Sequence, residues 1–464
     1  MSEAKTKRNE IDMLNGSLWD KIIIFALPLA FTGVMQQLFN TADVAVLGQF
    51  VGKNAIAAVG NNISLIGLLV NLFLGLSLGA NVVIAQSIGA KRLDRAHAAV
   101  AIAIVLALIV GIIIAIVGEI LTEPVLRYMD VPAEVWEMAE TYLRIYLIGM
   151  PAIGLYNFES AIFRSRGDTK TPLISLTIAS AINIILNLTA VLVFDFGVAG
   201  VAAATVIANI VSAGILFRAL ITENGVIHLE LDKLSISKHH LNLLVGSHPI
   251  IREIVRIGLP AGIQGMVFSL SNLLIQSAIN NIGADAMAAS AAAFTIEINV
   301  YCFMSAFGQA ATTFVSQNYG AGNLPRCKRI TWVTMLINGI FYLMVAATIL
   351  IFAEPLLKFF NSDPNVVELG KLRLWYIVSP QLINVIMEII SGTLRGYGIS
   401  MAPAILTLIG VCGVRITWLY TIFPQYPTYE TLMIVYPVSW FVTMVLLCIA
   451  YRFYIKNLKS IVIV

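Results

Sequence analysis

The chain has 464 residues, of which 59% are hydrophobic and only 12% charged, and its formal net charge is +3. Soluble domains carry about 25% charged residues, so this composition excludes an ordinary soluble protein and indicates a helical membrane protein. The basic residues lie between apolar runs, so we expect no nucleic-acid partner. The four scattered cysteines have no metal or disulfide spacing.

Residues 1–20 are polar at first and hold no cleavable apolar stretch, which predicts a cytoplasmic segment without a signal peptide. Apolar runs of about 20 residues then predict about twelve transmembrane helices, and hence an all-α polytopic fold. The runs lie near 20–50, 55–86, 93–118, 136–164, 172–194, 198–220, 254–281, 287–317, 328–353, 366–394, 403–423 and 430–453.

Lysine and arginine favour alternate loops, such as the one holding Lys91, Arg92 and Arg95. This bias predicts a multi-pass protein of the cell membrane with both termini cytoplasmic.

The two halves of the chain are copies. Ala26-Leu27-Pro28 corresponds to Gly258-Leu259-Pro260, and Val51-Gly52 corresponds to Ile282-Gly283, at an offset near 231 residues. Such a repeat predicts two six-helix lobes, 21–221 and 253–454, followed by a cytoplasmic tail at 455–464. The polar connection 222–252 is expected to be a solvated linker, and its stretch Leu229–Val245 is a candidate amphipathic surface helix.

Asp43 is a carboxylate in the middle of the first apolar run. A charge in hydrocarbon costs about 3 kcal/mol or more, so Asp43 is expected to face the protein interior or a wet cavity. Gln36 and Asn40 precede it at helical spacing, and we expect this face to line a polar cavity. The alternative is a structural carboxylate bonded by its neighbours.

Three polar residues in the fifth and sixth runs complete a possible site with Asp43. Asn183 and Asn187 share one helix face, and Thr205 lies in a run of small residues. One carboxylate, two amides and a hydroxyl suit a proton or a hard monovalent cation. Interhelical hydrogen bonding is the equally open structural alternative.

Three further carboxylates lie within the runs. Glu159 and Glu388 occupy equivalent places in the two halves, which favours a shared architectural role, such as binding a nearby arginine. Glu297 has no counterpart, which makes it a candidate for a cationic substrate or a second proton. Arg415 is expected to neutralise one of the C-terminal carboxylates, because an unpaired buried charge is costly.

Aromatic and methionine side chains of the second half could form a soft wall for an apolar substrate. They are Met266, Phe268, Met287, Phe294, Tyr301, Phe303, Met304, Phe307, Trp375 and Tyr376. Nucleotide-binding, metalloprotease and nucleophile-elbow motifs are missing from the sequence, so we expect no enzyme, no cofactor, and energy from an ion gradient.

The chain resembles the multidrug and toxic compound extrusion (MATE) family over nearly its whole length. The resemblance is carried by Leu27-Pro28, Asn40 to Gly48, Gln86 to Ala90, Arg166 to Pro172, Asn183 to Asn187, Gly197 to Thr205 and the second-half copies. It implies twelve helices in two six-helix lobes forming a V around a central cleft. It also implies export of organic cations against an inward flow of protons or sodium. We expect the chain to act as a monomer.

The family's coupling residues fall on Asp43, Asn183 and Thr205. Asn187 stands where members often carry an acid, which puts sodium binding in doubt. Carboxylates that some members carry near Phe268 and Asn384 are missing, and Glu297 and Glu388 are candidate replacements. The expected substrate cleft comprises Gln36, Asn40, Glu159, Glu297, Glu388, Met266 and Tyr301.

Two other kinds of function are alternatives to cation export. A flippase or exporter for a lipid-linked or endogenous amphiphile needs a basic cleft, and only Arg415 and Arg144 could supply one. From another class, the chain could be a non-transporting sensor or an intramembrane enzyme. An enzyme would need a paired nucleophile and base or metal ligands within the spans, which the sequence does not offer.

Overall fold

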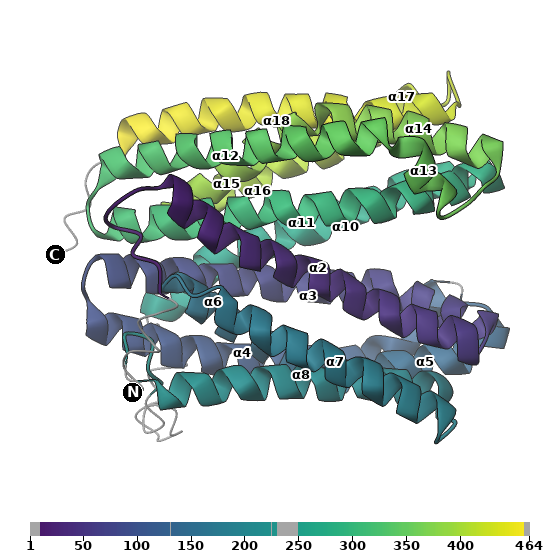
Figure 1. Cartoon of the computed structure of the whole chain (residues 1–464), viewed down its shortest axis with the longest axis horizontal. Helices are drawn as coiled ribbons and strands as arrows, with labels where there is room; N and C mark the ends of the chain where they lie inside the picture. The colour runs from purple at the N-terminus through teal and green to yellow at the C-terminus, as the bar shows by residue number, and fades with distance from the viewer. Residues whose placement is uncertain (1–9, 130, 224, 230–248, 459–464) are drawn as a thin grey trace. The chain divides into compact units, whose positions relative to one another are not determined.

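The computed structural model describes residues 10–129, 131–223, 225–229 and 249–458, and every regular element within them is helical (Figure 1). The first half holds α2 (Trp19–Phe50), α3 (Lys53–Gly89), α4 (Leu93–Tyr128), α5 (Ala133–Ile148), α6 (Met150–Ser165), α7 (Lys170–Leu192) and α8 (Gly197–Thr222). The second half holds α10 (Pro249–Asn280), α11 (Ala284–Gly320), α12 (Leu324–Ile351), α13 (Ala353–Lys358), α14 (Pro364–Val378), α15 (Leu382–Gly396), α16 (Met401–Thr407), α17 (Val414–Thr421) and α18 (Tyr429–Asn457).

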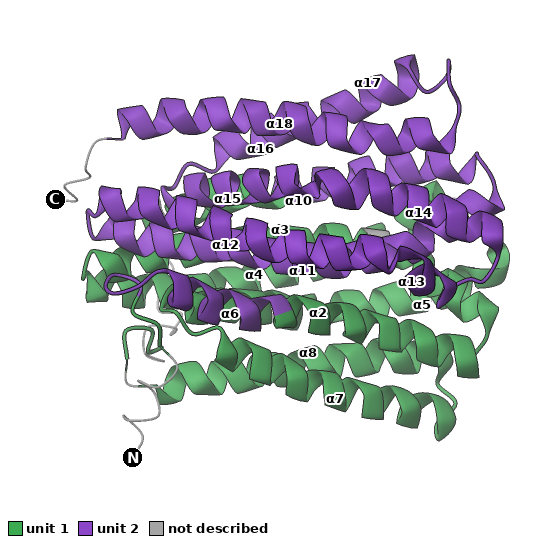
Figure 2. Cartoon of the chain, turned by 45° about the horizontal axis from the view of Figure 1, so that its top comes forward, with its two compact units in different colours: residues 1–12, 31–262 green, residues 13–30, 263–464 purple. Residues whose placement is uncertain are grey.

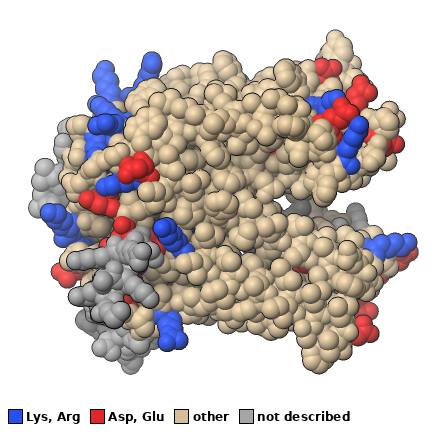
Figure 3. Space-filling model, viewed as in Figure 1, with Lys and Arg blue, Asp and Glu red and all other residues tan. Residues whose placement is uncertain are grey.

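Within the described ranges, 11 helical stretches are long and apolar enough to cross a membrane. The remaining expected span, 136–164, corresponds to α5 and α6, two helices of 16 residues that meet at Gly149 with a proline in the first turn of α6. Neither piece alone reaches the length of about 20 residues that a span requires. On the face shown in Figure 3, charged side chains gather toward the helix ends.

The chain forms two compact units that do not coincide with its two halves (Figure 2). Unit 1 combines residues up to 12 with 31–262, and unit 2 combines 13–30 with 263–464. The expected lobes, 21–221 and 253–454, assign α2 and α10 whole, whereas both helices are divided between the units. The linker stretch Leu229–Val245 lies, apart from Leu229, outside the described residues.

The first part of α10 packs against α3 in unit 1 because both helices present glycine at the crossing. A Cβ on Gly75 would lie 2.1 Å from the backbone nitrogen of Gly262, and one on Gly79 would lie 2.2 Å from the carbonyl oxygen of Ile254. Small residues allow this direct backbone contact between membrane helices. The crossing therefore holds the start of α10 in unit 1.

The first part of α2 is held in unit 2 by contacts with α11. The Phe25 ring packs edge-on against Phe314 with centroids 5.5 Å apart. The Asn318 amide donates to the carbonyl of Met13 at 3.0 Å, which fixes the chain just before α2. The start of α2 thus belongs to unit 2 and the start of α10 to unit 1, so the units exchange equivalent helix segments.

The repeat is also visible in the turns. Gly52, between α2 and α3, has φ 118°, and Gly283, between α10 and α11, has φ 140°. Side chains rarely adopt such a backbone, so each turn requires glycine. The equivalence of Val51-Gly52 and Ile282-Gly283 therefore extends to backbone conformation.

Candidate functional site

Asp43 lies in the second part of α2, within unit 1, and only 3% of it is exposed. Helices α7 and α8 pack tightly together and carry the polar residues that reach it. Phe39, one turn earlier on α2, packs with Ala179 of α7 and Ala208 of α8. The apolar face of α2 thus fixes Asp43 between these helices.

Asp43 accepts hydrogen bonds from two neutral donors. Asn187 Nδ2 donates to Asp43 Oδ1 at 2.6 Å, and Thr205 Oγ1 donates to Oδ2 at 2.7 Å. Asn183 supports both donors, since its Oδ1 lies 3.2 Å from Asn187 Nδ2 and its Nδ2 lies 3.3 Å from Thr205 Oγ1. The structure therefore brings the four expected coupling residues into one buried cluster.

The cluster lacks a countercharge within the described residues: Asp43 makes no ion pair there. The Asn187 Oδ1 atom is buried and receives no donor from that part of the chain. Neutral amide and hydroxyl dipoles stabilise a carboxylate less than a cation would. The cluster can therefore take up a positive charge, as a proton or as a small cation.

Two tyrosines that the sequence analysis missed complete this environment. Tyr142 and Tyr146 of α5 are 4% and 9% exposed, and both interact electrostatically with Asp43. Their rings stack with centroids 6.0 Å apart. Their spacing of four residues was the available signal, but tyrosine at that spacing is equally typical of packing.

Gln36 and Asn40 do not bond the Asp43 carboxylate. Asn40 is exposed and Gln36 is half-buried, whereas Asp43 is buried. Both Asp43 oxygens receive their bonds from α7 and α8. The shared polar face of α2 therefore divides into a buried site and a separate exposed part.

The expected binding of Glu159 to a nearby arginine is wrong. Glu159 is fully buried on α6, and neither carboxylate oxygen has a hydrogen-bond partner among the described residues. The nearby Arg166 pairs instead with Glu10, Asp168 and Glu223. A side chain with no exposure also cannot line an open cleft in this conformation.

Its counterpart, Glu388, is half-buried and accepts a hydrogen bond from the Tyr301 hydroxyl at 3.2 Å. Two of the expected cleft residues thus lie together. Arg395 donates to Gln264 Oε1 at 2.8 Å, and it interacts with Glu388 electrostatically without a direct ion pair. Met266 is half-buried on α10.

Glu297 is not the free acid that its unique position suggested. Arg373 holds it with two hydrogen bonds of 2.9 Å, from Nε to Oε1 and from Nη2 to Oε2. The side chains are 9% and 5% exposed, so this ion pair is buried. A paired carboxylate is a poor receptor for a second cation or a proton.

The expected pairing of Arg415 with a carboxylate is also wrong. Its guanidinium contacts Asn272, Ser439 and two aromatic rings, all of them neutral. The carboxylate of Glu297 goes to Arg373 instead. The sequence suggested Arg415 alone as the neutralising residue, and Arg373, 76 residues after Glu297, was not identified as a partner by spacing.

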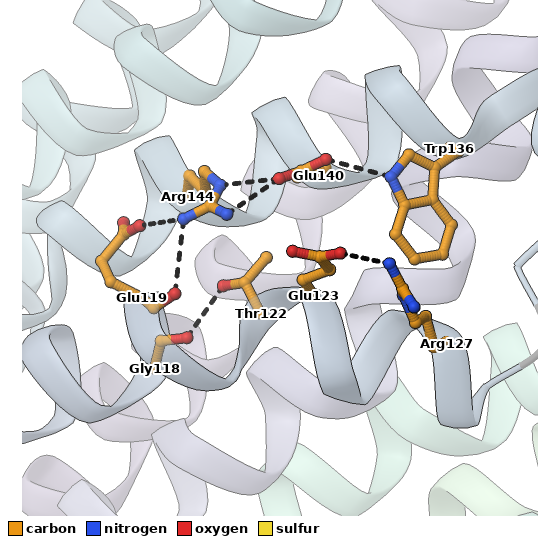
Figure 4. Close-up of polar contacts among 8 residues, drawn as sticks. All are labelled: Gly118, Glu119, Thr122, Glu123, Arg127, Trp136, Glu140 and Arg144. Carbon is orange, nitrogen blue, oxygen red and sulfur yellow. Dashed lines mark hydrogen bonds and ion pairs between the residues drawn. The ribbon is translucent and has the colours of Figure 1, made fainter.

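Arg144, the other arginine considered for a basic cleft, belongs to an acidic network (Figure 4). It donates to Glu119 Oε2 at 2.9 Å and to Glu140 Oε1 at 2.8 Å, and its side chain is 40% exposed. Two carboxylates already neutralise it. Arg144 is therefore a surface ion-pair residue and not a substrate-binding cation.

The aromatic wall expected in the second half is dispersed. Met287, Phe294 and Trp375 are 42%, 49% and 61% exposed, whereas Met304 and Phe307 are 1% exposed. Phe268 contacts Arg415, and Tyr301 contacts Glu388. These side chains do not share one surface.

The fold defines a multi-pass, all-helical membrane protein built from two related halves, with a buried carboxylate cluster in unit 1. The family model MatE matches residues 28–189 and again residues 260–421, one match in each half. The chain belongs to this family, the MATE transporters, which are not enzymes.

Relatives support the same family. The chain is 27% identical over 451 residues to "Probable multidrug resistance protein YoeA" of Bacillus subtilis, with 95% of each covered. It is 29% identical over 402 residues to "Probable multidrug resistance protein NorM" of Thermotoga maritima, covering 85% of this chain and 84% of that protein. A "FAD transporter" of Shewanella oneidensis is 24% identical over 343 residues, covering 72% and 73%.

Solved structures share the fold. "Crystal structure of MATE in the bent conformation" matches with a TM-score of 0.86 and 23% identity, covering 96% of this chain and 97% of the other. "Crystal structure of MATE in the straight conformation" matches with a TM-score of 0.84 and 24% identity, covering 96% and 98%. The all-helical fold class expected from the sequence is therefore confirmed, and the family model confirms the expected membership.

Proposed function

We propose that this MATE transporter exports organic cations or amphiphilic compounds in exchange for protons, by alternating access. One observation carries the proposal: Asp43 is 3% exposed and is held by neutral donors. Keeping a charge buried without a countercharge is costly, so the protonated and ionised forms favour different surroundings. Such a group can couple ion binding to a conformational change.

A proton fits the cluster better than sodium does. Asn187 and Thr205 already direct hydrogens at Asp43, which leaves few oxygens facing a metal ion. An amide can donate to the ionised carboxylate or, after rotating, accept from the protonated one. The site therefore suits both protonation states, whereas sodium would require several groups to turn.

In the proposed cycle, a proton from outside neutralises Asp43 and removes the cost of its burial. The bonds from Asn187 and Thr205 weaken, so α2, which contains Pro28, can repack. The outward-open state then releases the substrate, and loss of the proton to the inside restores the first state. Coupling requires only that proton and substrate prefer different conformations.

The test is efflux from proteoliposomes with proton and sodium gradients imposed separately. The variant Asp43→Asn keeps the shape of the side chain and removes its titration, so proton-driven efflux should be lost. The matched control is Asp195→Asn, at an exposed position in the turn before α8, which should transport normally. Undiminished efflux by Asp43→Asn would remove this residue from the mechanism.

A second candidate is the export of an endogenous amphiphilic metabolite. It is favoured by the relative named as a FAD transporter, whose name denotes an anionic, aromatic cargo. A substrate panel separates the two functions. Proton-driven efflux of organic cations favours the first, and transport restricted to anionic amphiphiles favours the second.

A further inference from the structure

Arg415 is a buried cation whose contacts are all neutral. It lies on α17 within unit 2 and is 1% exposed. Its Nη1 donates to Asn272 Oδ1 at 2.7 Å, and its Nε donates to Ser439 Oγ at 3.3 Å. The Ser439 hydroxyl proton goes to the Tyr436 carbonyl at 2.8 Å, so the serine oxygen is free to accept from the arginine.

The charge of Arg415 is only partly compensated. Its Cζ lies 4.4 Å from the centroid of the Tyr436 ring and 5.4 Å from that of Phe268, which provides cation–π stabilisation. Its Nη2 is buried and has no acceptor in the described part of the chain. A guanidinium cannot shed its proton under ordinary conditions, so the side chain must carry this charge.

A second arginine increases the positive charge of this region. The Arg373 guanidinium lies 5.9 Å from the centroid of the same Tyr436 ring. Glu297 neutralises Arg373, so these three ionised side chains leave one uncompensated positive charge. An anion is the species that the region lacks.

The backbone before Arg415 is unusual. Residues Leu408–Gly413 form a π-helical turn, which is rare and often marks functional sites. Gly410 within it packs so closely on α18 that a Cβ would lie 2.2 Å from Thr443 Oγ1. The distorted turn is therefore held in place by packing, and it ends two residues before Arg415.

The internal repeat relates Arg415 and Asn272 to positions in the first half of the chain. The two matched family segments begin 232 residues apart, at 28 and 260. At that offset Arg415 corresponds to Asn183, and Asn272 corresponds to Asn40. The Arg415 cluster is thus built on helices equivalent to those that hold the Asp43 cluster, although Asn40 itself lies outside that cluster.

The two α10 residues that contact the guanidinium are only partly buried. Phe268 and Asn272, one turn apart on α10, are both half-buried. The Asn272 oxygen is bonded to Arg415, which leaves its amide hydrogens able to donate to a ligand. The rings of Phe268 and Tyr436 provide flat apolar walls beside the charge.

We propose that Arg415 and Asn272 form an anion-binding site in unit 2 that takes a carboxylate or phosphate group borne by a flat, apolar molecule. The ligand anion pairs with Arg415 Nη2 and accepts from the Asn272 amide, while the apolar body packs on Phe268. This goes beyond proton coupling through Asp43. Occupancy can be measured without an ion gradient, so failure of either proposal is distinguishable from failure of the other.

The first experiment measures binding of 2-naphthyl phosphate to the purified full chain in neutral detergent, with 2-naphthylmethylamine as the cationic analogue. We expect saturable binding of the phosphate that Arg415→Gln weakens at least about tenfold, because a charge-assisted hydrogen bond is lost. Arg415→Lys should restore part of it. The control Arg452→Gln, at an exposed position on α18, should bind normally.

A second arm tests a lipid source for the anion. In phosphatidylcholine nanodiscs the probe should bind, and addition of phosphatidylglycerol should displace it if the natural ligand is a lipid headgroup. Probe binding that phosphatidylglycerol does not affect would assign the site to a soluble anion. Equal binding to wild type and Arg415→Gln, or preference for the amine, would overturn the proposal.

A third variant covers the case in which Arg415→Gln does not fold. Asn272→Asp places a carboxylate where the amide oxygen now lies, 2.7 Å from Arg415 Nη1. The internal anion should raise the unfolding temperature and abolish probe binding. Asn280→Asp, at an exposed position on the same helix, should do neither. Loss of stability in Asn272→Asp, or retained binding of the probe, would show that the Arg415 charge needs no anion and would overturn the proposal.

Discussion

The buried pair of Glu297 and Arg373 leads to a prediction about the order of two substitutions. Breaking a buried ion pair by removing one partner costs about 3–5 kcal/mol, because the other charge stays buried. This pair has two hydrogen bonds of 2.9 Å and side chains less than 10% exposed, so the range applies. Both single variants are therefore expected to destabilise unit 2 strongly.

The two variants should nevertheless differ in how much stability they lose. Glu297→Gln leaves both Arg373 and Arg415 beside the Tyr436 ring, and neither arginine can lose its charge. Arg373→Gln leaves Glu297, which can bind a proton and has Arg415 in the same region. We expect the loss of unfolding free energy to lie at the upper end of this range for Glu297→Gln and at the lower end for Arg373→Gln.

Tryptophan fluorescence during thermal and denaturant unfolding in detergent measures this order. The double variant Glu297→Leu with Arg373→Met should regain most of the loss, because well-packed apolar residues can replace a buried pair. The exposed pair of Glu123 and Arg127 provides the control, since Glu123→Gln should have no measurable effect. Greater damage from Arg373→Gln, or no recovery in the double variant, would refute the reasoning.

Three more substitutions test other parts of the molecule. Gly79→Ala forces α3 and α10 apart and should cost about 1–3 kcal/mol, whereas Gly60→Ala, which has no neighbour within 4 Å, should be neutral or stabilising in the same unfolding assay. Asn187→Asp adds an acidic oxygen beside the cluster and should make efflux respond to an imposed sodium gradient in proteoliposomes. Hydrogen bonds from Lys358 and a second lysine lower the pKa of Glu354 from 4.5 to about 2. Its contribution to stability is therefore complete above pH 4.5 and lost as the pH falls toward 2, so the difference in unfolding temperature between wild type and Glu354→Gln should be flat above pH 4.5.

Much of the fold follows from local sequence. Apolar runs of sufficient length can only be helices in a membrane, because every backbone group must be bonded internally. The grouping of Asp43 with Asn187 and Thr205 was also foreseeable, since a carboxylate within a span requires polar partners on facing helices. These predictions depend on spacing and on the cost of exposing polar groups to lipid.

The exchange of helix segments between the units was not predictable in that way. It depends on Gly75 and Gly79 meeting Gly262 and the Ile254 carbonyl, which lie about 180 residues later in the chain. Glycines are common in membrane helices, and their spacing does not identify the helix that they will contact. The partner of a small-residue face is therefore decided by tertiary packing.

The arginine partners predicted for Glu159 and Glu388 were wrong for the same reason. Repetition suggested that Glu159 and Glu388 bind arginines, yet Glu159 has no partner among the described residues and Glu388 binds Tyr301. Equivalent positions in a repeat share a backbone, but their neighbours have diverged. An ion pair needs both partners, so a substitution at either one changes it.

This divergence indicates that the two repeats have different roles in the proposed transport cycle. On equivalent helices, unit 1 holds Asp43 with amide and hydroxyl donors, and unit 2 holds Arg415 with amide and hydroxyl acceptors. A carboxylate can gain and lose a proton, whereas a guanidinium keeps its charge at any physiological pH. The cluster in unit 2 therefore cannot couple protons as the cluster in unit 1 can. Since Glu297 is also fixed in an ion pair, the proposed proton coupling rests on the unit 1 copy, and the unit 2 copy is left to bind a ligand by permanent charge.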